Sequence, residues 1–189
     1  VARIVSLEIG LGSTAIISAL LHNVVDNDNI TLEEIEQHFG KSVAVVIRGF
    51  SKISDLPTGK VYLQSENFRR LFLSLVGDIR VILIKLAHRL NDLRNFSSIP
   101  EENKTRFLQE AAYLYAPIAH RLGLYNIKSE LEELSMKYCK PEIYNSLSKK
   151  IQDTEVEREK FIRKFYKPIQ QALENNGYNC EIKSRLKSI

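Results

Sequence analysis

The sequence has few of the residues that build disulfide-linked, zinc-finger or membrane-spanning structures. Its 189 residues include two cysteines, five prolines, eight glycines and no tryptophan. Cys139 and Cys180 stand in no CxxC or paired Cys/His spacing, which excludes a zinc-finger or disulfide framework. The longest apolar stretches, 15–21 and 81–87, are far shorter than the roughly 20 residues that cross a bilayer. We therefore expect a soluble, cytoplasmic protein with no membrane partner.

The sequence also has no large excess of basic over acidic residues. Lys and Arg number 27 against 23 Asp and Glu, which gives a formal net charge of +4. No basic stripe with interleaved aromatic residues is evident, so we expect no direct binding of nucleic acid by this chain. A hydrophobic share of 44% is enough to form a substantial core, which excludes a disordered chain.

Apolar residues recur at helical spacing through most of the chain, which predicts a mostly α-helical fold. Thr31 and Glu34 form a capping-box pattern, and Gly40 is placed to end the helix that follows. Asp78 is placed to open a very apolar helix, and Pro117 should kink another. The predicted helices cover 13–25, 31–40, from 42, from about 65, 79–93, 100–123, from 141, and 153–175, with a loop at 55–60.

The last residues, 178–189, have a different pattern. Apolar or small side chains alternate there with charged ones, which predicts a strand. A single strand after an all-helical chain has nothing to pair with. We therefore expect the sequence to stop just inside a second domain, of α+β type.

Two histidines lie in the two most apolar predicted helices. His22 is followed by Asp26 and His88 by Asp92, and the i, i+4 spacing puts each imidazole and carboxylate on one helical face. If the two polar stripes face each other, these four residues and Asn23 converge into one buried cluster. Such a cluster is either a metal or acid–base centre or a hydrogen-bonded core network, and spacing alone favours the network.

Longer motifs show a resemblance to a known family. Residues 18–25 (SALLHNVV) resemble the histidine–aspartate box of the RelA/SpoT alarmone enzymes, usually written ALLHDVVED. Residues 39–54, 64–94 and 115–144 are similar to successive blocks of the same family. The likeness runs over the whole chain. It implies a helical HD-type domain and enzymes that make and destroy (p)ppGpp in the stringent response.

The resemblance implies a metal site that has changed here. Family members with a working hydrolase hold manganese with two histidines and two aspartates. His22 corresponds to the second histidine, while the first would lie upstream of Val1. The two aspartate positions are occupied by Asn23 and His88.

Further positions of the same centre differ from the family pattern. The supporting acidic pair, usually Glu-Asp, is Asp26-Asn27 here, and the last Asn of the second block is Asp92. The changes remove about two negative charges around a cation that prefers oxygen ligands. We therefore expect no metal and no cofactor in this chain, and a degenerate, inactive hydrolase centre at His22, Asn23, Asp26, Asn27, His88 and Asp92. In the alternative, two histidines and two aspartates of this set hold zinc or nickel.

The last six residues, 184–189, resemble the opening of the synthetase motif, commonly GRPKSxYSI. Arg185 and Lys187 match the cations that contact the ATP donor, and Leu186 replaces the usual Pro. The resemblance thus implies a Mg²⁺-dependent synthetase that transfers pyrophosphate from ATP to GTP or GDP. Arg185 and Lys187 are its nucleotide-binding candidates.

These expectations divide the chain into an HD-type domain at 1–130, a helical connector at 131–177 and the start of a truncated (p)ppGpp synthetase domain at 178–189. The parent protein is expected to be a GTP pyrophosphokinase with guanine nucleotides, ATP and the ribosome as partners. In it the HD domain would be regulatory. Two alternatives remain: an active metal-dependent (p)ppGpp 3′-pyrophosphohydrolase, and a helical interaction or oligomerisation module.

Overall fold

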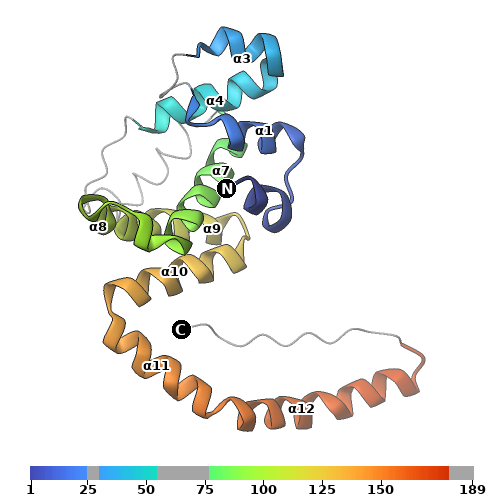
Figure 1. The fold of residues 1–189 in the computed structure, drawn as a ribbon. Coiled ribbons are helices and arrows are strands. Elements are labelled where there is room, and N and C mark those ends of the chain that lie inside the picture. The colour runs from blue at the N-terminus through green and yellow to red at the C-terminus, as the bar shows by residue number, and fades with distance from the viewer. Residues whose placement is uncertain (25–29, 55–76, 179–189) are drawn as a thin grey trace. The chain divides into compact units, whose positions relative to one another are not determined.

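A computed structural model describes residues 1–24, 30–54 and 77–178 of the chain (Figure 1). These residues form helices joined by turns, and no strand occurs among them. The prediction of a mostly α-helical chain is therefore confirmed. The predicted loop at 55–60, the helix from about 65 and, apart from Tyr178, the strand at 178–189 lie outside the described residues.

The chain divides into two compact units, Val1–Ser135 and Met136–Ile189. The three-part domain organisation expected from the sequence stays a prediction. The first unit is built from the following elements: η1 (Ile4–Glu8), α1 (Ser13–Leu21), α3 (Leu32–Phe39), α4 (Lys41–Ser54), α7 (Ile79–Arg94), η2 (Phe96–Ser98), α8 (Glu101–Glu110), η3 (Ala111–Tyr115), α9 (Ala116–Arg121) and α10 (Tyr125–Cys139), whose last turn passes the boundary. None of the helices in the described part of the chain is both long and apolar enough to span a membrane.

Helix α7 is the centre of the first unit. It contacts η1, α1, α4, α8 and η3, so it is covered on several sides, as expected of a helix that is apolar on most of its faces. Its buried side chains are Val81, Ile82, Ile84, Leu86, Ala87, Arg89, Leu90 and Leu93. Each fully buried Leu or Ile contributes about 1.5–3 kcal/mol relative to an exposed one. The core therefore holds α7, and every polar group on it, in a fixed position.

Local signals in the sequence set the ends of α3 and α7. The backbone N–H of Glu34 donates to Thr31 Oγ1 at 3.2 Å, and the N–H of Thr31 donates to Glu34 Oε2 at 2.8 Å. Gly40, with φ of 86°, ends α3. Asp78 Oδ1 accepts from the N–H of Arg80 at 2.9 Å and caps α7. The capping box, the glycine stop and the role of Asp78 are all confirmed.

The predicted end of one helix was wrong. Helix α1 ends at Leu21 rather than at 25, and His22 is its C-terminal cap. The His22 ring bonds the carbonyl of Ala19, which the next helical turn would otherwise use. The kink predicted at Pro117 stays a prediction. The chain passes through the π-helical turn η3, and Pro117 lies in the first turn of α9, where a missing N–H costs little.

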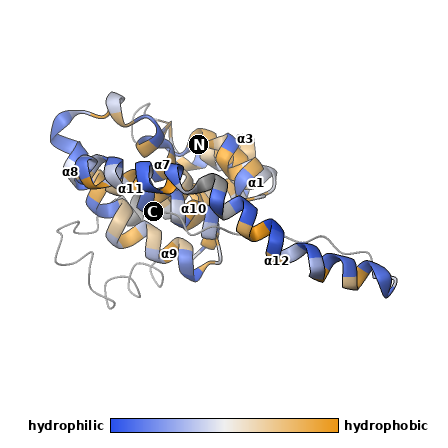
Figure 2. Ribbon diagram, turned by 90° about the horizontal axis from the view of Figure 1, so that it is seen from below, coloured by the Kyte–Doolittle hydropathy of each residue, from blue (hydrophilic) through white to orange (hydrophobic). Residues whose placement is uncertain are grey.

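The second unit contains α11 (Pro141–Asp153) and α12 (Glu155–Asn175). The predicted helix at 153–175 is confirmed to within two residues, and Gly177, with φ of 78°, follows its end. No described side chain of this unit is fully buried. Phe161 and Phe165 are 70% and 68% exposed. Figure 2 shows hydrophobic and hydrophilic patches alternating along α12.

Candidate functional site

His22 and His88 meet at the face of α7 that α1 and α4 cover. The two ring centroids are 4.9 Å apart and the ring planes are inclined by 77°. Phe50 of α4 lies beside His22, with a centroid separation of 5.7 Å. Gly49 lets α4 come this close, because a Cβ at that position would lie 2.6 Å from Cγ2 of Val81. Two histidines that are 66 residues apart in the sequence thus share one packed site.

The His22 ring has one bonded nitrogen and one that is not. Nδ1 lies 2.9 Å from the carbonyl oxygen of Ala19. Since a carbonyl can only accept, Nδ1 carries the proton and Nε2 carries the lone pair. Nε2 is buried and has no hydrogen-bond partner among the described residues. A buried polar atom in this state costs about 1–3 kcal/mol.

Burial favours the neutral form of His22. Desolvation lowers the pKa of the ring below its ordinary value, and the neighbouring His88 ring lowers it further. The bond to Ala19 acts in the opposite direction, and the cation of Lys85 adds to the lowering. The imidazole of His22 is therefore held in its neutral form, in which Nε2 can act as an electron-pair donor.

His88 is oriented by a carboxylate one turn further along α7. Its Nδ1 lies 3.1 Å from Oδ2 of Asp92. The i, i+4 spacing seen in the sequence therefore joins these two side chains, as it can on any helix. The His88 side chain is 31% exposed, so this end of the site reaches the surface.

Asp92 belongs to a second group of charges that lies deeper in the protein. Oδ2 of Asp92 also accepts from Nη1 of Arg89 at 3.3 Å, and Nη2 of Arg89 donates to Oε2 of Glu110. The guanidinium carbon of Arg89 lies 3.8 Å from the centroid of the Phe107 ring. Arg89 and Glu110 are only 8% and 5% exposed. A continuous polar chain therefore runs from His88 through Asp92 and Arg89 to Glu110.

Sequence reasoning missed Arg89 and Glu110. The available signal was a charged residue on the apolar face of each predicted helix, since such residues are rarely buried without a partner. Tyr115 lies beside this pair, with its ring centroid 5.5 Å from the guanidinium carbon of Arg89. Burial raises the pKa of Tyr115 to about 12. Its hydroxyl therefore remains protonated at neutral pH.

The other predicted site residues are Asn23 and four residues outside the described part of the chain. Asn23 is exposed on the turn after α1. Asp26 and Asn27 lie outside the described residues, as do Arg185 and Lys187. From the predicted set the structure thus brings together His22, His88 and Asp92.

The described residues of this site do not fit manganese. No three His, Cys, Asp or Glu side chains are arranged to hold a metal ion within 1–24, 30–54 and 77–178. The carboxylate of Asp92 is already engaged by His88 and Arg89. Of the three side chains that the structure brings together, two imidazole nitrogens remain, whereas manganese prefers oxygen ligands.

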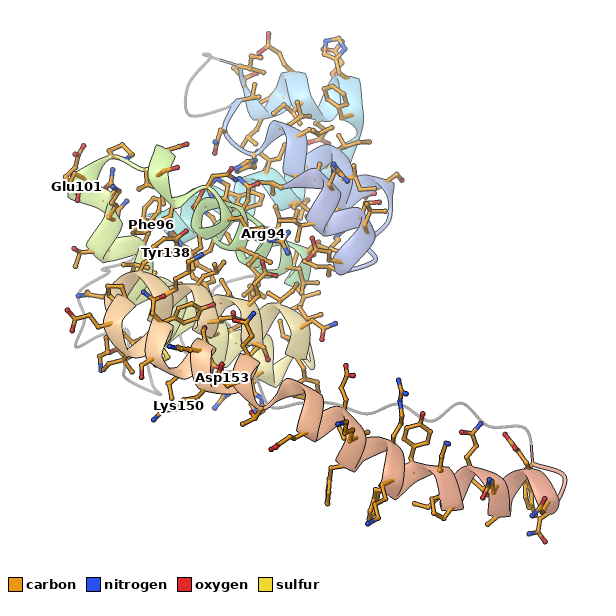
Figure 3. All side chains as sticks on the ribbon, turned by 60° about the horizontal axis from the view of Figure 1, so that its bottom comes forward. Arg94, Phe96, Glu101, Tyr138, Lys150 and Asp153 are labelled. Carbon is orange, nitrogen blue, oxygen red and sulfur yellow. The ribbon has the colours of Figure 1, made fainter. Side chains whose placement is uncertain are left out.

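Arg94, in the last turn of α7, forms an arginine fork, in which one guanidinium binds two carboxylates. The guanidinium of Arg94, labelled in Figure 3, donates to both carboxylate oxygens of Glu8 at 2.7 and 2.9 Å and to both of Glu130 at 2.6 and 2.7 Å. Hydrogen bonding to Arg94 lowers the pKa of Glu8. The fork ties η1 and α10 to the helix that carries His88.

Comparison with protein families finds a match to the HD domain over residues 1–125. The expectation of an HD-type helical domain is therefore confirmed. The match includes every described residue of the His22–His88 site and of the Arg89–Glu110 pair.

Comparison with characterised proteins finds relatives along nearly the whole chain. The bifunctional (p)ppGpp synthase/hydrolase SpoT of Escherichia coli is 37% identical over 183 residues, which is 96% of this chain and 26% of that protein. The guanosine-3′,5′-bis(diphosphate) 3′-pyrophosphohydrolase of Aquifex aeolicus is 37% identical over 95% of the chain and 26% of its own length. The GTP pyrophosphokinase of Myxococcus xanthus is 36% identical over 96% of the chain and 25% of its own length. The chain thus spans about a quarter of each relative.

Proposed function

The chain belongs to the HD domain family, with an HD domain of the RelA/SpoT type, and from this premise we propose that the domain is a regulatory one that does not hydrolyse (p)ppGpp with manganese. The relatives carry both hydrolase and pyrophosphokinase names, so membership alone does not decide between the two activities. The residues at the site therefore carry the proposal.

The proposal rests on which possible metal ligands lie where α1 and α7 come together. The family resemblance puts acids at the positions of Asn23 and His88, and this chain has a neutral amide and an imidazole there. His88 bonds Asp92, whose carboxylate is also taken by Arg89. Manganese would supply a water of lowered pKa to attack the 3′-pyrophosphate. With two anionic ligands replaced, the ion would be held weakly and the water would lose its activation.

The activity proposed for the longer protein is synthesis of (p)ppGpp. It would transfer pyrophosphate from ATP to GTP or GDP with Mg²⁺, in the cytoplasm, with guanine nucleotides, ATP and the ribosome as partners. Arg185 and Lys187 would contact the ATP phosphates, since two cations at i and i+2 on a strand point to the same face. The HD domain would position or restrain this synthetase.

The test is a comparison of hydrolysis and synthesis in the full-length protein. We expect (p)ppGpp synthesis and no release of pyrophosphate from ppGpp with Mn²⁺. The double variant Asn23→Asp/His88→Asp should gain Mn²⁺-dependent hydrolysis, because it returns two anionic ligands. A control with the same chemical changes at exposed positions, Asn145→Asp/His120→Asp, should gain none.

The second candidate is an active 3′-pyrophosphohydrolase, which is favoured by the names of several relatives at 37% identity. It predicts Mn²⁺-dependent hydrolysis by the unaltered protein and a loss of that activity when His22 or His88 is replaced. Hydrolysis by the unaltered protein above its metal-free background would overturn the first proposal in favour of this one.

A further inference from the structure

Helix α12 ends in an asparagine–glycine pair. Asn176 is the C-terminal cap of the helix, and Gly177 follows it with φ of 78°. Asn176 is the one asparagine in the sequence that is followed by a glycine. Both residues are exposed, and a Cβ added to Gly177 would meet no atom within 4 Å beyond the adjacent residues. The peptide bond between the two residues is therefore open to solvent and unhindered.

This pairing of side chain and backbone permits an intramolecular reaction. Glycine has no Cβ, so the nitrogen of Gly177 is the least hindered kind of backbone nucleophile. It attacks Cγ of Asn176, an N–Cγ bond forms, the Cγ–Nδ2 bond breaks, and the proton of the attacking nitrogen leaves with the amide as ammonia. Water then opens the cyclic succinimide at either carbonyl. The product is aspartate or isoaspartate, and solvent water is the only co-reactant.

Two hydrogen bonds at the end of α12 control this reaction. Nδ2 of Asn176 donates to the carbonyl of Ala172 at 2.7 Å, and the N–H of Gly177 donates to the carbonyl of Glu174 at 3.0 Å. They hold the two reacting groups on separate carbonyls, so both bonds must open before the ring can close. They lie in the exposed last turn of a helix, where opening costs least free energy. The fold therefore slows the reaction without preventing it.

We propose that Asn176 is a site of spontaneous deamidation and that the product weakens the end of α12. Aspartate or isoaspartate lacks the Nδ2 donor to Ala172, and its negative charge lies beside the last carbonyls of the helix, which carry partial negative charge. Isoaspartate also adds a methylene to the backbone between α12 and residues 178–189, which contain the nucleotide-binding candidates Arg185 and Lys187. The inference does not depend on whether the domain hydrolyses (p)ppGpp.

Peptide mapping of the unaltered 189-residue chain tests the reaction. The folded chain is kept at neutral and at mildly alkaline pH, and mass spectrometry follows the change of amide to acid at each asparagine. Asn176 should react several-fold faster than Asn145 and Asn175, which are also exposed but precede other residues. Labelling with an isoaspartyl methyltransferase should locate isoaspartate at position 176. Equal rates at these positions would overturn the proposal, as would no reaction while the chain stays folded.

The neighbouring asparagine supplies a matched control. Asn176→Gln should abolish the isoaspartate label, because the longer side chain closes a ring less readily. Asn175→Gln, which changes an exposed amide one residue earlier, should leave the label unchanged. If the label is lost in Asn175→Gln or survives in Asn176→Gln, the assignment to Asn176 is wrong.

The effect on the helix has its own readout. Asn176→Asp reproduces the charge of the product, and amide hydrogen exchange in the last turn of α12 should be about two- to fivefold faster than in the unaltered chain. Asn145→Asp, an exposed position within α11, should leave that exchange unchanged. Equal exchange in Asn176→Asp and the unaltered chain would overturn the claim that the product weakens the helix. Because these readouts are chemical and local, a failure here leaves the hydrolysis test of the regulatory function intact.

Discussion

The two units of the chain use similar helices in different ways. In Val1–Ser135, α7 is covered by several neighbours and buries eight side chains, one of them the arginine Arg89. In Met136–Ile189, α12 is longer than α7, yet Phe161 and Phe165 on it are mostly exposed. Apolar residues at helical spacing occur in both helices, so the spacing does not decide burial. What decides it is the number of elements that pack around the helix.

This difference extends to charged residues. In the first unit Arg89 and Glu110 are buried and form an ion pair. Removing either partner would leave the other as an unpaired buried charge, which is strongly destabilising. The charged side chains described on α12 are exposed, where ion pairs contribute little. Substitutions of the same chemical type should therefore have very different effects in the two units.

The largest expected effect is that of Glu110→Ala. It leaves the guanidinium of Arg89 buried without its carboxylate partner, which should lower the free energy of unfolding by about 3–5 kcal/mol. Glu157→Ala, on the exposed side of α12, should change it by less than about 0.5 kcal/mol. Urea unfolding followed by circular dichroism measures both. Similar losses in the two variants would show that the charge pair of the first unit is not buried in solution.

The next effect separates the apolar side chains of the two units. Leu86 is fully buried, and Leu86→Ala should cost about 2–5 kcal/mol through lost contacts and the cavity that remains. Phe165 is 68% exposed, so Phe165→Ala should cost less than about 0.5 kcal/mol although it removes a larger side chain. A large loss for Phe165→Ala in the same unfolding assay would mean that α12 is covered in solution.

The sequence predicted most of the described helices, because their ends are local. The capping box at Thr31 and Glu34, the stop at Gly40 and the cap at Asp78 each depend on residues within one turn. The end of α1 was missed because the His22 ring bonds a carbonyl of the preceding turn, which apolar spacing does not reveal. The π-helical turn before Pro117 was missed for a similar reason, since the spacing on either side of it is ordinary.

The site was predictable in its residues but not in its bonding. His22, His88 and Asp92 were singled out from their spacing and from the family resemblance. The partners that fix their chemistry come from the tertiary structure: Phe50 packs on His22 from α4, and Glu110 of α8 holds Arg89. Which ring nitrogen is free follows only from the bonds to Ala19 and Asp92. Sequence spacing predicted the pairing of His88 with Asp92, but it contains no information about the contacts that Phe50 and Glu110 make.

The smallest expected effect is a change of the free energy of unfolding with pH. It again distinguishes a buried side chain from an exposed one. Burial lowers the pKa of His22 in the folded state below its value of about 6.5 in the unfolded chain. The unfolded chain therefore binds more protons than the folded one as pH falls through this range. Stability should decrease as pH falls from about 7.5 to about 5.5 and be recovered when pH is raised.

The pH slope can be assigned to His22 by substitution. His22→Asn removes the titrating group, so urea unfolding between about pH 5.5 and 7.5 should show a flatter dependence than in the unaltered chain. His120→Asn, which removes an exposed histidine, should keep the original slope. The lowered pKa values of Glu8, Glu34 and Asp78 act below about pH 5, where stability is lost as these carboxylates take up protons, so they do not interfere. If the His22→Asn variant keeps the original pH dependence of the unfolding free energy, another titrating group causes it. The neutral ring of His22 would then not be its source.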